Sequence, residues 1–151
     1  MKRTSFGDSI CPVARSLDLI GDWWTLLIVR DAARGIKRFS EFQRSLGAAK
    51  NILSVRLKAL VAEDILQVAP ASDGSAYQEY VLTQKGRDLQ TVLVALNQWG
   101  ERYLFAEGEF CSQLVDKQDK KPLQRLQIHA EDGRVLSAQD IVLNSDNDAV
   151  A

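Results

Sequence analysis

The pattern of apolar and polar positions predicts helices through the first part of the chain. A proline directly after Cys11 suits the first turn of a helix over residues 12–20, and Gly21 can end that helix. Asp22 is then a good N-cap for a second helix, which Gly35 closes. In the second helix apolar residues recur at spacings of three and four, as on a buried helix face: Trp24, Leu27 and Ile28.

Two further helices are expected before the period changes. Phe39 and Phe42 mark a short third helix that ends near Gly47. A fourth helix is expected over residues 50–64, and its narrow apolar stripe consists of Leu53, Leu57, Leu60 and Val61. The opposite face of this fourth helix carries Asn51, Ser54, Val55 and Lys58. The fourth helix is therefore amphipathic, with one face for a core and one for solvent or a partner.

Beyond residue 64 the apolar period becomes that of strands. Residues 65–69 and 77–82 predict two strands, and the turn-rich segment between them carries Asp73 and Gly74, which together indicate a β-hairpin. Thr83 can then cap a long helix that runs to about residue 106. Its apolar residues are Leu89, Val92, Leu93, Leu96, Trp99 and Tyr103. We expect so wide an apolar surface to cover the helix's own domain with one face and a partner chain with the other.

The remaining residues have a different pattern, which divides the chain into three parts. We expect a domain over residues 8–106, a C-terminal extension over residues 107–143 and a disordered tail over residues 144–151. In the extension Asp132 and Gly133 form a turn before Val135, which predicts a β-hairpin, and residues 141–143 are a candidate for one more strand. The expected fold class is α+β and mostly helical: a winged helix-turn-helix with flanking dimerisation helices and a small β-rich C-terminal tail.

Charge is unevenly distributed, although the net charge of the 151 residues is only −1. Residues 1–104 hold 14 basic and 11 acidic side chains, whereas residues 105–151 hold 5 and 9. Within residues 30–58 eight basic side chains stand against two acidic ones. A local basic block on a nearly neutral chain indicates a surface that meets a polyanion, although an ordinary solvated helix face would have the same composition.

The order of elements and the basic block together suggest DNA binding. In a winged helix-turn-helix one helix enters the major groove while the hairpin touches the backbone beside it. Asn and Ser side chains can hydrogen-bond base edges, and Lys and Arg serve bases or phosphates. We therefore expect four residues to face the groove, Asn51, Ser54, Val55 and Lys58, and four to lie toward phosphates, Arg38, Arg44, Lys50 and Arg56. Taken alone, the fourth helix fits a plain amphipathic surface helix better than a DNA-reading helix.

Six short motifs, taken in order and spacing, resemble the HxlR-type family of winged-helix transcriptional regulators over roughly residues 8–105. The motifs are residues 11–13 (CPV), 21–28 (GDWWTLLI), 38–42 (RFSEF), 53–60 (LSVRLKAL), 80–86 (YVLTQKG) and 99–100 (WG). The resemblance implies a cytoplasmic homodimer whose fourth helix reads double-stranded DNA and whose hairpin is the wing. It also implies that the first and last domain helices pack across a two-fold axis, and we expect the interface to include Leu17, Leu89, Leu93, Leu96 and Trp99.

The chain departs from the family pattern at two places. Ala48 and Ala49 stand where the family usually has Ser or Thr before the DNA-reading helix, and alanine as an N-cap costs about 1 kcal/mol relative to Ser. The wing tip, residues 72–76, carries no Arg or Lys, so we expect the wing to contribute little affinity for DNA.

Cys11 and Cys111 are candidate redox residues. Some relatives of this type sense oxidants through a cysteine at the position of Cys11. A thiol at a helix N-terminus is a favourable place for a thiolate, because free amide groups there stabilise the anion. Oxidised Cys11 could then be captured by Cys111 of the other subunit. The alternative is that Cys11 is a small, inert residue packed in the dimer seam.

Several function classes are not expected. The sequence has no apolar run long enough for a membrane span and no visible secretory signal. His129 stands alone, the two cysteines lack metal-ligand spacing, and there is no glycine-rich phosphate loop, so we expect no enzyme activity, metal or cofactor. The effector, if there is one, stays unidentified. The rival hypothesis is a winged helix used only for protein–protein contacts, which would not need a basic fourth helix.

Overall fold

The computed structural model describes residues 4–144 of the chain. The chain falls into two units, an N-terminal unit of residues 1–93 and a C-terminal unit of residues 94–151. The boundary lies inside the helix α6 (Gln90–Tyr103), whereas the sequence pattern places the end of the domain near residue 106. The disordered tail was predicted for residues 144–151, and all of it except residue 144 lies outside the described residues.

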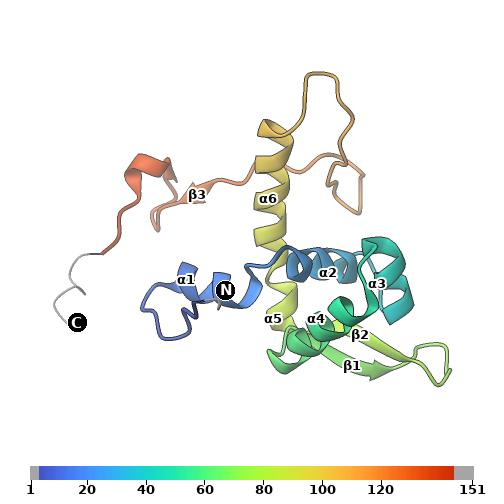
Figure 1. The fold of residues 1–151 in the computed structure, drawn as a ribbon. Coiled ribbons are helices and arrows are strands. Elements are labelled where there is room, and N and C mark those ends of the chain that lie inside the picture. Colours follow the sequence, from blue (N-terminus) through green and yellow to red (C-terminus); the bar gives the residue numbers. More distant parts are fainter. Residues whose placement is uncertain (1–3, 145–151) are drawn as a thin grey trace. The chain divides into compact units, whose positions relative to one another are not determined.

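The N-terminal unit begins with the helices predicted from the sequence (Figure 1). They are α1 (Pro12–Ile20), α2 (Trp23–Ala33), α3 (Phe39–Leu46) and α4 (Lys50–Ala62). Asp22 caps α2 as expected, because its carboxylate accepts a hydrogen bond from the Thr25 backbone N–H at 3.0 Å. Gly47 ends α3 at φ 64°, a left-handed conformation that glycine adopts at no steric cost. Asp22 therefore sets where α2 begins, and Gly47 sets where α3 ends.

The wing is an antiparallel hairpin of β1 (Leu66–Pro70) and β2 (Gln78–Leu82), with Leu66 opposite Leu82. The Tyr80 backbone N–H also donates to the Lys37 carbonyl at 2.7 Å, which fastens β2 to the link between α2 and α3. The hairpin is therefore tied to the helices at the middle of its strands, while residues 71–77 form its tip.

The prediction of a single helix from residue 83 to about residue 106 is wrong. The structure has α5 (Gln84–Arg87), then a turn at Asp88 and Leu89, and then α6, which ends at Tyr103. The Leu89 N–H bonds to the carbonyl of Gly86, three residues back, so the α-helical pattern is interrupted there. Gly86 packs against the chain after α4 so closely that a Cβ atom would lie 2.3 Å from the Ile65 carbonyl oxygen.

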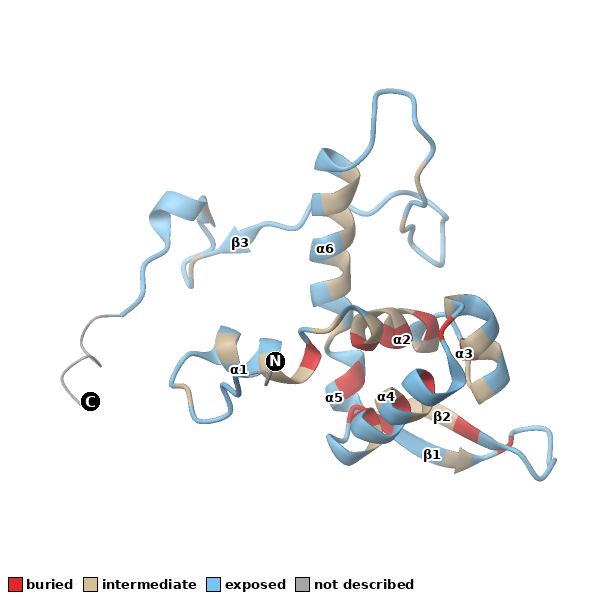
Figure 2. Ribbon diagram, viewed as in Figure 1, coloured by how far each residue is buried: buried red, intermediate tan, exposed pale blue. Residues whose placement is uncertain are grey.

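One hydrophobic core holds the N-terminal unit together, and the buried residues in Figure 2 lie mainly on α2, α4 and the hairpin. Its largest fully buried apolar side chains are Phe42, Ile28, Leu53, Leu57, Leu60, Ile65 and Leu66. Leu89, in the turn before α6, and Leu93, in the first turn of α6, pack against this core. The expectation that one face of this helix covers its own domain is thus confirmed for the first turn of α6.

The C-terminal unit contains the rest of α6 and the extension. The strands β3 (Ile128–His129) and β4 (Val135–Leu136) pair antiparallel, with Gly133 in the turn at φ 90°. The candidate strand at residues 141–143 does not form, and a short helical turn, η1 (Ala138–Asp140), precedes it. No residue between 94 and 144 is buried (Figure 2).

Candidate nucleic-acid interface

The fourth helix, α4, has a buried and an open side. Leu53, Leu57 and Leu60 are at most 2% exposed, which fixes the rotation of the helix about its axis. That rotation leaves Asn51, Val55 and Lys58 exposed and Ser54 half-buried. The four residues predicted to face a DNA groove therefore lie away from the core.

The start of α4 explains one departure from the family pattern. Ala48 is 5% exposed and belongs to the hydrophobic core, so a small apolar residue suits this position. Ala49 is the N-cap of α4 and makes no side-chain cap. The first backbone N–H groups of α4 therefore have no side-chain acceptor from the capping residue.

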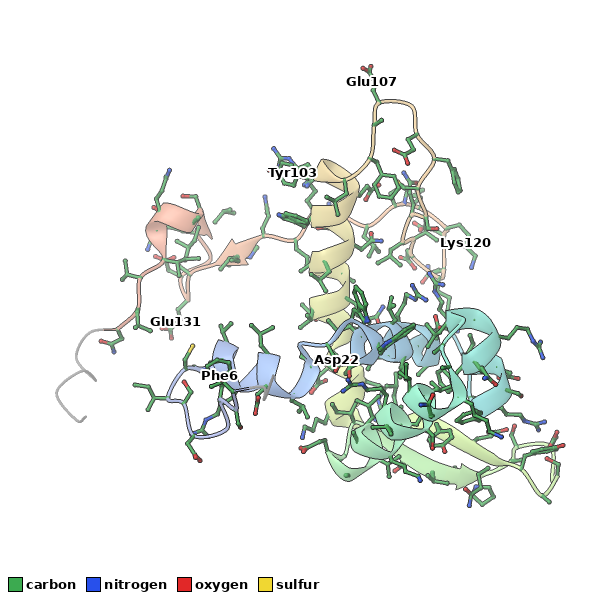
Figure 3. The ribbon with its side chains drawn as sticks, in the orientation of Figure 1. Phe6, Asp22, Tyr103, Glu107, Lys120 and Glu131 are labelled. Carbon is green, nitrogen blue, oxygen red and sulfur yellow. The ribbon has the colours of Figure 1, made fainter. Side chains whose placement is uncertain are left out.

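The four cations predicted to meet phosphates differ in their surroundings. Arg44 and Lys50 are exposed. Arg56 is half-buried, and its Nη1 lies 3.4 Å from Oδ2 of Asp22, the residue that caps α2. Figure 3 shows Asp22 at the start of α2. Arg56 thus links α4 to α2, and its guanidinium would have to leave the Asp22 carboxylate to contact a phosphate.

Arg38 is bound to the tip of the wing. Its guanidinium pairs with the carboxylate of Asp73, lies 3.4 Å from the Ser75 hydroxyl and stacks over the Tyr77 ring at 5.2 Å. The wing tip has no cation of its own, and Arg38 supplies one from the N-cap of α3. No sequence signal pointed to this contact, because Arg38 and Asp73 are 35 residues apart.

Hydrogen bonds keep the acidic groups at the wing ionised. Ser75, through its hydroxyl and its backbone N–H, and then Arg38 hold the pKa of Asp73 well below its usual range. In turn the hydrogen bond with Asp73 raises the pKa of Arg38. Beside the tip, on β2, the buried Glu79 accepts from the backbone N–H and hydroxyl of Ser72, which lowers its pKa. The tip is therefore a fixed pairing of charges at neutral pH.

The residues predicted for a dimer interface fall into two groups. Leu17 on α1 is 54% exposed, and Leu96 and Trp99 on α6 are 50% and 56% exposed. Leu89 and Leu93 instead pack against the core of the N-terminal unit, and any contact with a partner stays a prediction for them. On α6 the exposed apolar residues repeat at spacings of three and four: Val92, Leu96, Trp99 and Tyr103, the last labelled in Figure 3.

The two candidate redox residues are both free thiols. Cys11 is exposed and is the N-cap of α1, with its backbone N–H bonded to the Ser9 hydroxyl at 3.1 Å. Cys111 is half-buried in the C-terminal unit. Among residues 4–144, no group of three or more His, Cys, Asp and Glu side chains is arranged to hold a metal ion. No helix in this part of the chain is long and apolar enough to cross a membrane.

Known proteins resemble this chain in both sequence and fold. An uncharacterised HTH-type transcriptional regulator of Mycobacterium tuberculosis, Rv3095, is 45% identical over 92 residues, which are 61% of this chain and 58% of the relative. The alignment thus covers a little more than half of that relative's length. The crystal structure of PA1607, described as a candidate transcription factor, is 52% identical with a TM-score of 0.88, and the match covers 93% of this chain and 99% of that one.

A third likeness is to the redox regulator HypR in its reduced form. It is 31% identical with a TM-score of 0.55, and the match covers 61% of this chain and 92% of HypR. The model of one family, the HxlR-like helix-turn-helix, matches residues 19–107. This stretch contains the helices α2 to α4, the wing and α6, and it confirms the resemblance seen in the sequence motifs. The chain therefore belongs to the HxlR-like helix-turn-helix family.

Proposed function

We propose that this chain is a transcriptional regulator that binds double-stranded DNA as a homodimer, with α4 in the major groove. The observation that carries the proposal is the two-sided character of α4. Leu53, Leu57 and Leu60 anchor one side in the core, while the exposed side carries Lys50, Asn51 and Lys58 together with the apolar Ile52 and Val55. A groove-entering helix needs this arrangement, because base edges offer hydrogen-bond partners and flanking phosphates attract cations. Membership of a helix-turn-helix family supports it.

Individual residues have distinct roles in this proposal. The exposed side of α4 contacts base edges through Asn51, Ser54, Val55 and Lys58. Arg44 and Lys50 contact phosphates from exposed positions. Arg38 and Arg56 contact phosphates only when each exchanges its carboxylate partner, Asp73 or Asp22, for DNA. The wing then lies along the backbone beside the groove, with Arg38 as its cation.

The test is salt-dependent retention of DNA. Genomic fragments are retained on the purified protein at low and then at higher salt, and the retained fragments are sequenced. Affinity should fall steeply with salt because bound counterions are released from DNA. Lys58→Ala should weaken binding by about 1–3 kcal/mol. Lys117→Ala removes the same charge from an exposed site in the extension and should leave binding unchanged.

The rival proposal is a winged helix that binds only proteins. It predicts no salt-sensitive preference for any genomic fragment over random DNA. In that case Lys58→Ala and Lys117→Ala would behave alike. The basic, carboxylate-free α4 favours DNA, since the thirteen residues of this helix include no Asp or Glu.

The homodimer rests on exposed apolar stripes. On α6 Leu96, Trp99 and Tyr103 are each at least half exposed, and on α1 Val13 and Leu17 are also more than half exposed. A second copy of the chain covers such surfaces with a symmetric, self-complementary contact. Two copies also present two reading helices, which fits half-sites about one helical turn apart on pseudo-palindromic DNA.

Light scattering at micromolar concentration tests the dimer. Leu96→Asp should give monomers, because an unpaired carboxylate in an apolar interface is costly to desolvate. Its DNA affinity should fall as well, since one reading helix then meets one half-site alone. A wild-type protein that is monomeric at this concentration would contradict the dimer.

A redox response is a second function that we propose, on the exposure of Cys11 at the N-terminus of α1. Peroxide would oxidise the Cys11 thiolate to a sulfenic acid, and the Cys111 thiol of the other subunit would displace water from it to form a disulfide. Similarity to the redox regulator HypR supports this proposal. Cys11→Ser should keep DNA binding and lose the response to peroxide. A Cys11 that is alkylated only after denaturation, with Cys111 replaced, would contradict it.

A further inference from the structure

Two apolar side chains lie on the open side of α4. Val55 is 63% exposed and Ile52 is 39% exposed, whereas the leucines on the other side of the helix are buried. Together with Asn51 and Arg56 they line a shallow surface hollow. Single exposed apolar residues are ordinary on protein surfaces. Two adjacent apolar side chains beside the Asn51 amide, on the helix face proposed to contact DNA, indicate a surface that can contact an apolar group of a base.

The major groove presents one apolar group, the methyl group of thymine, and the edge of an adenine there suits an amide side chain. Thymine carries a methyl group at C5, which apolar side chains contact. Adenine presents N7 and N6, which an Asn side chain can bind with two hydrogen bonds. Asn51 and Val55 are four residues apart, so they project from the same face of α4, one turn apart. One helix face can therefore read adenine and thymine together.

Two other features of α4 also favour a thymine and an adenine as the bases that this helix face meets. Recognition of cytosine through its N4 donor uses a carboxylate, and α4 contains no Asp or Glu. Lys50 and Lys58, on either side of the hollow in the sequence, are exposed and make no ion pair with any residue of the described chain. DNA that brings a thymine methyl group into the hollow would place phosphates near the two lysines and an apolar group against Val55 and Ile52.

We infer that each half-site of the DNA bound by this protein contains a thymine whose C5-methyl group packs against Val55 and Ile52, and a nearby adenine held by Asn51. This inference rests on the proposed function and adds to it the bases that are read. Val55 is then a specificity-determining residue. Its contribution depends on one methyl group of the DNA, which chemistry can remove without changing base pairing.

The experiment replaces thymine by deoxyuridine, one position at a time, in the site recovered by salt-resistant retention. At one position in each half-site, loss of the methyl group should lower wild-type affinity about three- to fivefold, as expected for one buried methyl group. Val55→Ala should lose most of the difference between the thymine and deoxyuridine sites at that position, and the double change Val55→Ala with Ile52→Ala should lose all of it. Val68→Ala, which truncates a 43% exposed valine on β1, should keep the wild-type difference.

A second substitution isolates Asn51. Replacing adenine by 7-deazaadenine removes the N7 acceptor, and wild-type affinity should fall at one position per half-site. Asn51→Ala should lose this difference while it keeps the thymine-to-deoxyuridine difference that belongs to Val55. Because Asn51 and Val55 are exposed, both variants should melt at the wild-type temperature.

The outcomes separate this inference from the proposal beneath it. Salt-sensitive binding to a preferred site, with no position at which deoxyuridine changes affinity, would overturn the methyl contact and leave the DNA-binding proposal standing. The same holds if Val55→Ala keeps the full thymine preference. If no fragment is preferred over random DNA, the proposed function itself fails, and the inference fails with it.

Discussion

The two units of the chain differ in how they are stabilised. The N-terminal unit has a core of side chains such as Phe42, Ile28 and Leu57, which are inaccessible to solvent. The C-terminal unit has no buried residue among residues 94–144, although helix, hairpin and turns are formed there. Within this unit the Gln98 side-chain amide joins α6 to the extension, because it donates to the Gln124 carbonyl at 3.0 Å and accepts from the Leu126 N–H at 2.8 Å.

This difference indicates where each unit obtains its stability. A two-stranded hairpin is at best marginally stable in water, and a segment without a buried core has little hydrophobic burial to offset the conformational entropy that it loses on ordering. The C-terminal unit also exposes large apolar side chains, among them Phe110 at 89%, Val142 at 84% and Leu143 at 85%. Burial of these side chains against the proposed second copy of the chain would stabilise this unit. The acidic excess after residue 104 makes DNA an unsuitable partner for this segment.

The largest expected effect contrasts two phenylalanines. Phe42→Ala empties a fully buried site and should destabilise the N-terminal unit by about 3–5 kcal/mol at any protein concentration. Phe110→Ala should change stability only through association, so its effect should appear as a concentration-dependent shift of the melting temperature. Chemical unfolding of both variants over a hundredfold concentration range measures the contrast. An equal, concentration-independent loss for Phe110→Ala would contradict it.

A second contrast uses two glycines. Gly86→Ala places a Cβ atom 2.3 Å from the Ile65 carbonyl oxygen, so the backbone must shift, at a cost of about 1–3 kcal/mol. Gly100→Ala lies within α6, where the nearest atom to a new Cβ, Leu104 Cδ1, is 3.8 Å away. It should stabilise the helix by about 0.5–1 kcal/mol. Urea unfolding curves of the two variants should therefore move in opposite directions from wild type.

The same comparison shows what sequence could predict. The helices α1 to α4 and the wing were predicted because their apolar spacing and caps, such as Asp22 and Gly47, are local signals. The break between α5 and α6 was missed, since it depends on the contact of Gly86 with Ile65, more than twenty residues away. For the site, the open face of α4 followed from periodicity, but the binding of Arg38 and Arg56 to carboxylates did not, because tertiary packing selects those partners.

The smallest expected effect concerns the turns of the two hairpins. In the wing Asp73 pairs with the distant Arg38, whereas in the extension Asp132 pairs with Arg134, two residues on, at 2.8 Å. Asp73→Asn removes a negative charge beside the proposed DNA surface and releases Arg38. Affinity for DNA should rise a few-fold, and the salt slope should steepen by about 0.9 for each phosphate that Arg38 gains. Asp132→Asn makes the same charge change and should leave DNA binding unaltered.

The pKa of Asp73 predicts how the effect of Asp73→Asn on DNA affinity depends on pH. Ser75 and then Arg38 lower the pKa of Asp73 below 3.8, so the folded protein favours the ionised carboxylate. The pairing therefore contributes fully above that value and is lost only as pH falls through the lower, folded-state pKa. Between pH 6 and 8 the gain in affinity from Asp73→Asn should be constant. Fluorescence anisotropy titrations at both pH values measure it, and an unchanged affinity would mean that Arg38 stays on the wing and does not bind phosphate.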